Sequence, residues 1–117
     1  MPSERPEAGF WLEQLVFQNL QVWAACGPRR SISYWRDGTR EVDFVIAQGD
    51  QLVAIEVKSA ASLSGSGFNG LRAFQSAFTK RGLQPPLGIL LSPATMPLSF
   101  GEHLYSLHLH PFAPPQK

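Results

Sequence analysis

Residues 41–59, EVDFVIAQGDQLVAIEVKS, limit the possible folds of this chain more than any other stretch. Apolar residues dominate both sides of Gly49-Asp50, a pair that is typical of tight hairpin turns. The pattern predicts one strand near 40–47 and another near 51–58, paired antiparallel. Any fold for this sequence must therefore be built around a central β-hairpin.

The other elements follow from turn signals and periodicity. Asp37-Gly38 is a second turn signal and adds a strand in front of the hairpin. Apolar periodicity predicts two helices, and short apolar or alternating runs predict two further strands. The predicted ranges are helix 8–25, strands 31–36, 40–47 and 51–58, helix 68–82, and strands 87–92 and 104–110. This order gives a mixed sheet with helices packed on it, in the α/β or α+β class.

Charged residues interrupt the apolar pattern of the hairpin. If Gly49-Asp50 forms a two-residue turn, the register places Asp43 directly opposite Glu56 and Glu41 opposite Lys58. Strict alternation also puts Asp43 on the same side as Glu41. Two carboxylates that face each other across a ladder repel, and a hard divalent cation between them would remove that penalty.

Two alternatives stay open at this point. A turn centred on Gln48-Gly49 would place Ala54 opposite Asp43 instead. The hairpin could also be an ordinary amphipathic one, with a wet polar side and a weak surface ion pair between Glu41 and Lys58.

A further acid lies in the first predicted helix. Glu13 falls between Val16, Phe17 and Leu20 on the apolar side of the helix, whereas the glutamines of this segment cluster on the opposite side. It is either a boundary residue whose carboxylate reaches water or a buried functional acid.

These residues occur in four blocks that resemble a known family. The blocks are GFWLEQLV (9–16), YWRDGTREVDFVI (34–46), LVAIEVKS (52–59) and LRAF (71–74). They are similar to DUF4143, a domain of unknown function found at the C-terminal end of many AAA-type ATPases. An acid on an N-terminal helix, then Asp in a strand, then Glu-x-Lys in the next strand also resembles the PD-(D/E)XK nuclease superfamily.

The resemblance implies a fold and an activity. The implied fold is an α/β restriction-endonuclease-like core, and the implied activity is Mg²⁺- or Mn²⁺-dependent hydrolysis of phosphodiester bonds. Asp43 and Glu56 would be metal ligands, with the Val57 carbonyl and Glu13 completing the set. Lys58 would be the catalytic lysine that orients the water or stabilises the developing negative charge. Glu13, Asp43 and Glu56 are thus expected both as catalytic residues and as ligands.

The resemblance also implies partners. The expected partners are a nucleic acid, with DNA favoured over RNA, and an AAA-type ATPase domain or protein. No ATPase domain is present in this sequence, so we expect an isolated domain or a truncated relative. RecB-like nucleases carry Gln-x-x-x-Tyr on the following helix, whereas here Gln75 is followed four residues later by Thr79.

Contacts to a nucleic acid rest on residue type alone. Basic and polar side chains that could face phosphates are Arg36, Arg40, Arg72, Gln75 and Lys80. Tyr34, Trp35 and Phe68 could stack on bases. Solvated positive charge and core aromatics are the alternative for each of them.

Composition sets the remaining expectations. The single Cys26 excludes an internal disulfide, favours a cytoplasmic protein, and is expected to be a small buried residue. No apolar run is long enough for a membrane span. We expect one domain over residues 8–110, a flexible segment over 1–7 and a disordered tail over 111–117. Two functions remain: a nuclease, or a non-catalytic module that binds nucleic acid or a partner protein.

Overall fold

The structure is a computed structural model that describes residues 6–58, 68–92, 98–99 and 103–108. The predicted tail 111–117 and most of the predicted N-terminal segment lie outside the described residues. The elements are helix α1 (Pro6–Ala25), strands β1 (Arg30–Asp37), β2 (Arg40–Gln48) and β3 (Gln51–Val57), helix α2 (Asn69–Thr79), and strands β4 (Leu87–Ser92), β5 (Leu98–Ser99) and β6 (Leu104–His108).

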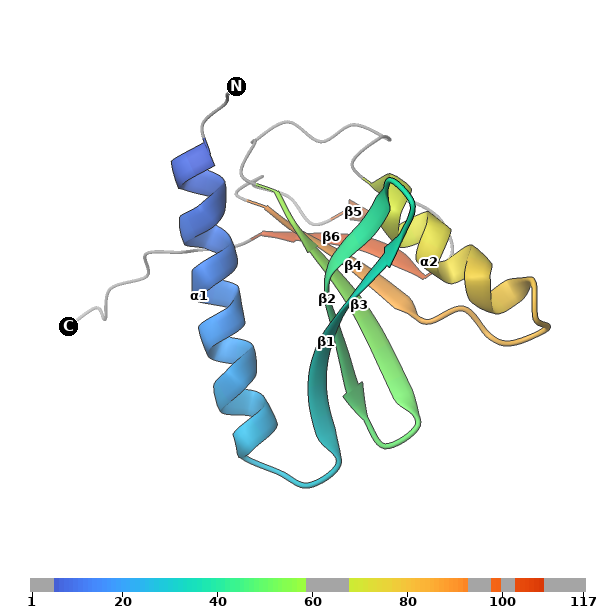
Figure 1. The fold of residues 1–117 in the computed structure, drawn as a ribbon, viewed down its shortest axis with the longest axis horizontal. Coiled ribbons are helices and arrows are strands. Elements are labelled where there is room, and N and C mark those ends of the chain that lie inside the picture. The colour runs from blue at the N-terminus through green and yellow to red at the C-terminus, as the bar shows by residue number, and fades with distance from the viewer. Residues whose placement is uncertain (1–5, 59–67, 93–97, 100–102, 109–117) are drawn as a thin grey trace.

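The strands of the described part form one mixed sheet in the order β1-β2-β3-β4-β6-β5 (Figure 1). The β1–β2 and β2–β3 pairs are antiparallel, as predicted for the meander, while β3–β4 and β4–β6 are parallel. Helix α2 makes the crossover between β3 and β4, because parallel neighbours cannot be joined by a tight turn. The fold is therefore α/β with a mixed sheet.

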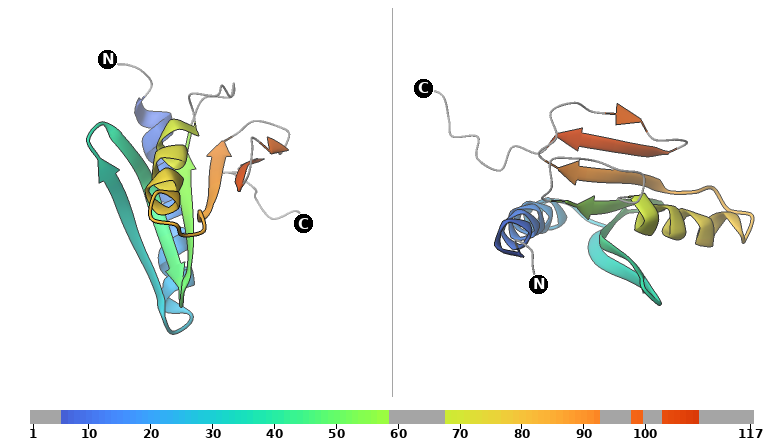
Figure 2. Two further views of the ribbon diagram at one scale, coloured as in Figure 1. Left: turned by 90° about the vertical axis from the view of Figure 1, so that its right-hand side faces the viewer. Right: turned by 90° about the horizontal axis from the view of Figure 1, so that it is seen from above.

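The two helices cover opposite faces of the sheet (Figure 2). Successive side chains of a strand point to opposite faces of the sheet, so β3 contributes side chains to two hydrophobic cores. Ala54 packs with Leu71 and Phe74 of α2. Ile55 and Val57 pack with Val16 of α1. A strand that is buried on both faces has little room for charge, which makes the acids near its C-terminal end conspicuous.

Most predicted boundaries agree with the structure to within one or two residues. The strand predicted over 87–92 is confirmed with the same bounds, and the last strand is described as far as His108. The helix predicted over 68–82 ends three residues early, at Thr79, and Gly82 follows with a φ of 75°. Strand β5 was not among the predicted strands, because its two residues are too few for an alternation to show.

The environment of Cys26 was predicted wrongly. The apolar run around it suggested a buried position, but α1 ends at Ala25 and the next residue is exposed. Within the described residues, neither helix combines the length and the hydropathy that crossing a membrane requires.

A β-bulge interrupts the β1–β2 ladder beside the charged residues. Ser33 pairs with Val45 and Trp35 pairs with Val42, so Tyr34 alone faces two residues of β2. The extra residue shifts the alternation of β2 side chains between the two faces of the sheet. Val42 and Val45, three residues apart, therefore both point into the core on the α2 side. The predicted strict alternation around Asp43 is therefore wrong, because the bulge depends on the pairing with β1.

Candidate active site

The carboxylates of Asp43 and Glu56 meet at the end of the β2–β3 ladder. The ladder has the predicted register, with Gln48 paired with Gln51, and its last regular pair is Phe44 with Ile55. Beyond that pair the strands are joined by side chains. The Asp43 N–H donates to Glu56 Oε1 at 2.9 Å, and the Val57 N–H donates to Asp43 Oδ2 at 2.9 Å.

This reciprocal pattern replaces main-chain bonds. In a continued ladder, Val57 would exchange backbone hydrogen bonds with Val42, two residues beyond the last regular pair. Instead a carboxylate oxygen accepts the Val57 N–H. Each acid thereby satisfies an amide of the opposite strand, which fixes both carboxyl groups in place. The prediction that Asp43 faces Glu56 is confirmed in this sense, although the contact is made by hydrogen bonds and not by a ladder pair.

Burial dominates the electrostatics of the pair. Only 10% of the Glu56 side chain is exposed. Burial, followed by the negative charge of Asp43, raises the pKa of Glu56 to about 7. Burial also raises the pKa of Asp43, against the opposing effects of the Val57 N–H and the Lys58 charge. A hydrogen bond between the two carboxyl groups stabilises the protonated form of Glu56. Near neutral pH the pair can therefore share one proton.

Lys58 is the nearest cation to this pair among the residues that the structure describes. Its Nζ lies 3.8 Å from Glu56 Oε2, and 44% of its side chain is exposed. The distance is too long for a hydrogen bond but allows an ionic attraction. The predicted pairing of Lys58 with Glu41 is wrong: Glu41 Oε1 contacts Arg36 Nη2 at 3.2 Å, because both side chains lie on the β1–β2 pair. The backbone N–H of Lys58 donates to the backbone oxygen of Leu91 in β4, so it bonds to the parallel half of the sheet.

Helix α1 brings Glu13 toward the same end of the sheet. Its side chain is half-buried. This lies between the two possibilities left open by the sequence, a boundary residue that reaches water and a buried acid. Partial burial raises the pKa of Glu13, and the charges of Asp43 and Glu41 add to the rise. Glu13 therefore lies within electrostatic range of Asp43.

The donor set suits a hard cation only in part. The buried Glu56 and the half-buried Asp43 supply oxygen ligands of the type that Mg²⁺ and Mn²⁺ prefer, and each has a second oxygen besides the one that accepts an amide N–H. Over the ranges that the structure describes, however, no three His, Cys, Asp or Glu side chains are arranged closely enough to hold a metal ion. A cation there would be bound by Asp43 and Glu56, with Glu13 acting directly only after a side-chain movement.

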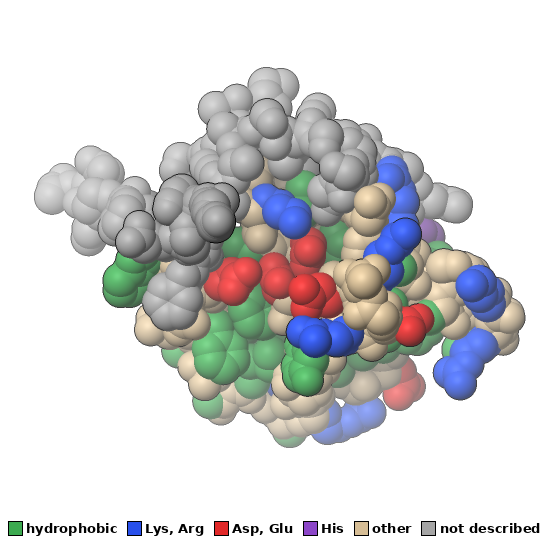
Figure 3. Space-filling model, turned by 45° about the horizontal axis from the view of Figure 1, so that its top comes forward, with side chains coloured by type: hydrophobic (Ala, Val, Ile, Leu, Met, Phe, Trp, Pro, Cys, Tyr) green, Lys and Arg blue, Asp and Glu red, His purple; other side chains and the backbone are tan. Residues whose placement is uncertain are grey.

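Basic side chains surround the acids on the molecular surface. Figure 3 shows acidic side chains gathered near the middle of one face, with lysine and arginine side chains around them. Arg36 and Arg40 are exposed on the β1–β2 hairpin, and the Arg72 guanidinium lies 5.6 Å from the Phe68 ring centre at the start of α2. Lys80 is exposed at the opposite end of α2 and is not brought to the carboxylates.

Three of the residues named for nucleic-acid contacts are buried or packed in the core. Gln75 is buried, and its amide nitrogen donates to Pro86 O at 2.8 Å and to His103 O at 2.9 Å. Phe68 is fully buried, and Trp35 packs edge-on against Phe74. Tyr34 is the most exposed of the three residues expected to stack on bases, with 71% of its surface exposed.

Sequence reasoning missed two features of the site. Glu41 was considered as a partner of Lys58 and a neighbour of Asp43, but not as a charge that acts on both Glu13 and Asp43. Gly70 was not singled out, although a Cβ atom there would collide with the backbone carbonyl of Glu41. This close approach of α2 to β2 requires glycine. A glycine in the first turn of a predicted helix was the available signal.

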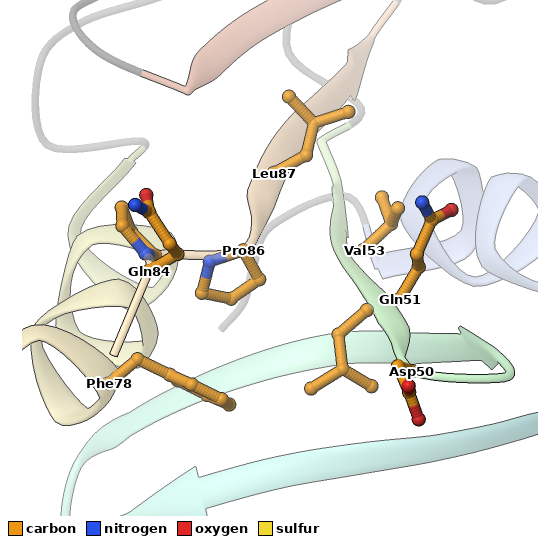
Figure 4. Close-up of a pocket in the computed structure, with 9 residues that line it drawn as sticks. Asp50, Gln51, Val53, Phe78, Gln84, Pro86 and Leu87 are labelled. Atoms are coloured by element: carbon orange, nitrogen blue, oxygen red, sulfur yellow. The ribbon is translucent and has the colours of Figure 1, made fainter. Parts of the chain in front are cut away.

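A cavity of about 390 Å³ lies at the other end of β3 (Figure 4). Its walls come from the β2–β3 turn, the end of α2 and the segment before β4, and the lining residues are Asp50, Gln51, Leu52, Val53, Phe78, Gln84, Pro85, Pro86 and Leu87. Asp50 alone among them is charged, so this cavity lacks the converging polar groups of a catalytic site.

The fold and the site define an α/β domain with a hydrogen-bonded, largely buried acid pair and an adjacent lysine at the end of a central hairpin. Residues 8–112 match the family model of the domain of unknown function DUF4143. The chain belongs to this family, which confirms the resemblance based on the four sequence blocks. Searches against curated proteins and against solved structures gave no match.

Proposed function

We propose that this protein is a metal-dependent nuclease of the PD-(D/E)XK type with a restriction-endonuclease-like core. One observation carries the proposal: Asp43 and Glu56 are held face to face by reciprocal hydrogen bonds, with Lys58 next to them. A structural hairpin would gain stability from an apolar pair at this position, because burying two carboxylates is costly.

Each residue has a proposed role. Asp43, Glu56 and the carbonyl of Val57 hold a divalent cation, and Glu13 joins them from α1. When bound, such an ion polarises a phosphate and lowers the pKa of a water molecule. The exposed end of Lys58 lies where it can orient that water or stabilise negative charge on the phosphate. In the proposed complex the surrounding arginines would bind the backbone of a nucleic acid, and Tyr34 beside the bulge would stack on a base.

Cleavage assays test the proposal. The protein is incubated with end-labelled single- and double-stranded DNA and RNA, in Mg²⁺, in Mn²⁺ or in EDTA. We expect metal-dependent cleavage that falls by about 100-fold or more in Glu56→Gln and Lys58→Met. Asp50→Asn removes an exposed carboxylate from the turn end of the same hairpin and should leave cleavage unchanged.

Metal binding is measured separately from cleavage. The amides of Asp43 and Val57 donate to the two carboxylates, so their NMR signals should shift on addition of Mg²⁺. The shifts should be absent in Glu56→Gln. If saturating Mg²⁺ leaves both amides unmoved, the nuclease proposal fails.

A second candidate is a non-catalytic module that binds nucleic acid or a partner protein, as an accessory to an AAA-type ATPase. The absence of a third close donor in the described residues favours it. In that case labelled nucleic acid would bind without being cut, with equal affinity for the original protein and for Glu56→Gln in EDTA.

A further inference from the structure

Tyr34 lies next to the Asp43–Glu56 pair, on the outer strand of the sheet. Strand β1 is the first in the sheet order, and its only neighbour among the described strands is β2 (Figure 1). The bulge places Tyr34 across from two residues of β2, Asp43 and Phe44. Because neighbouring strands are about 5 Å apart, one strand spacing separates the backbones of Tyr34 and Asp43.

The alternation of β1 directs the Tyr34 ring to the α1 side of the sheet. Its neighbour Trp35 packs edge-on against Phe74 of α2, and successive side chains of a strand point to opposite faces. Phe44 lies on the same side as Tyr34, because its ring stacks on that of Phe17 in α1 at a centroid distance of 5.9 Å. Tyr34 is therefore an aromatic residue at the outer edge of this face.

The Tyr34 side chain is presented to solvent and is not used for packing. Its exposed fraction is larger than that of any other exposed large hydrophobic residue in the described part of the chain. Among the described residues, no hydrogen bond, ion pair or ring contact involves this side chain. Tyrosine is enriched at binding surfaces, because its ring offers an apolar face and its hydroxyl a polar end. An exposed ring one strand away from two acids is thus placed to contact a ligand of the site.

The charges at the end of the β1–β2 hairpin bear on the kind of nucleic acid that fits. Residues 36–41 are all exposed and carry two arginines and two acids, so their charges cancel. Arg36 already pairs with Glu41 at 3.2 Å. Sequence-independent binding of a duplex depends on cations that neutralise its phosphates. A neutral hairpin end is poorly suited to that task, whereas stacking of a base on an aromatic ring needs no net charge.

We propose that the site takes a single-stranded nucleic acid, with an unpaired base stacked on Tyr34 and an adjoining phosphate beside Asp43 and Glu56. This inference rests on the proposed nuclease function and names its substrate class. A base within a duplex is covered by its neighbours, whereas a base of a single strand can turn outward onto an aromatic side chain. Every base has a π face, so binding through Tyr34 should tolerate many sequences. DNA and RNA share this chemistry, and both are tested.

Fluorescence anisotropy in EDTA measures binding without cleavage. The probes are labelled oligomers of about 15 nucleotides, as single-stranded DNA, single-stranded RNA and duplex DNA. We expect at least one of the single strands to bind about 10-fold more tightly than the duplex. Tyr34→Ala should weaken binding of that strand by about 5- to 100-fold, as expected for the loss of one stacked base, and should change duplex binding by less than about twofold.

Matched variants separate stacking from a general loss of structure. Tyr34→Phe keeps the ring and should retain the single-strand affinity to within about threefold. Tyr105→Ala removes another exposed tyrosine, on β6, and should leave the affinity unchanged. Circular dichroism checks that each variant is folded. In the original protein, the NMR signals of the Tyr34 ring should shift when the single strand is added, which tests the contact without any substitution.

Three results would overturn the substrate class. They are equal affinity for single strands and duplex, no single-strand binding at about 1 mM protein, and a loss in Tyr105→Ala as large as that in Tyr34→Ala.

Cleavage in Mg²⁺ tests the nuclease function separately. A protein that binds single strands through Tyr34 but cuts no nucleic acid refutes the nuclease and retains the single-strand preference. A protein that cuts duplex and single strands at equal rates, with Tyr34→Ala as active as the original, supports the nuclease and refutes the preference.

Discussion

The two ends of the β2–β3 hairpin are built from different interactions. At the turn end, Gly49 takes a φ of 62°, and regular backbone pairs continue as far as Phe44 and Ile55. At the other end, a bulge interrupts β2 and carboxylates take the place of backbone carbonyls. The regular end provides register and apolar burial. The irregular end holds two acids at a cost in stability, which agrees with the proposal that it is a catalytic site.

Ile55→Ala should have the largest effect on stability. Ile55 is 6% exposed and packs in the core under α1, at the last regular pair. Its truncation should lower the free energy of unfolding by about 2–5 kcal/mol, measured by urea denaturation. A loss below about 1 kcal/mol would show that the regular end does not carry the stability assigned to it.

Gly70→Ala should destabilise by a smaller amount. In a helix, alanine is favoured over glycine by up to about 1 kcal/mol. Here the added Cβ collides with the Glu41 carbonyl, so overpacking should outweigh that gain and cost a net of about 1–3 kcal/mol. Thermal and urea unfolding give the sign. An increase in stability would mean that α2 does not approach β2 as closely as described.

Glu56→Gln should change how stability depends on pH. The folded pKa of Glu56 is raised to about 7 from an ordinary value of 4.5, so the folded state binds its proton more tightly than the unfolded state does. Its contribution is fully present below pH 4.5 and is lost as the pH rises through 7. The difference in unfolding free energy between the original protein and Glu56→Gln, measured in EDTA, should therefore fall by about 1–3 kcal/mol across that window.

The pH experiment has an internal control at the turn end. The exposed Asp50→Asn variant removes one carboxylate from the same hairpin without touching the buried pair. Its stability curve should run parallel to that of the original protein across this window. A curve for Glu56→Gln that also runs parallel would show that Glu56 titrates alike in the folded and unfolded chains.

Arg36→Ala should have the smallest effect. The Arg36–Glu41 pair is 3.2 Å apart, but more than half of each side chain is exposed. Such pairs contribute about 0–1 kcal/mol, and salt reduces the contribution further. A loss well above 1 kcal/mol that persists at high salt would place Arg36 in the structural framework of the site.

The sequence predicted the regular end well because the signals there are local. Gly49-Asp50 and the apolar runs beside it determine the turn and the register without reference to the rest of the chain. The opposition of Asp43 and Glu56 followed from that register. The unusual position of Glu13 among apolar residues was likewise visible from one helix alone.

The irregular end could not be predicted because it depends on distant partners. The bulge exists only through the pairing of β2 with β1, and it alters which side chains share a face with Asp43. The pairing of Glu41 with Arg36 follows from the same strands. Gln75 looked like a surface residue because its two acceptors, Pro86 O and His103 O, belong to other segments.

The position of β3 has a consequence for folding. It is the strand at which the antiparallel meander joins the parallel half of the sheet. Local hairpins close quickly, whereas the β3–β4 pair must wait for the α2 crossover to bring distant segments together. We therefore expect Asp43 and Glu56 to come into contact early in folding, when both carboxylates are still exposed to water. The final docking of β4 then removes water from a carboxylate pair already in place, and acid should speed that step.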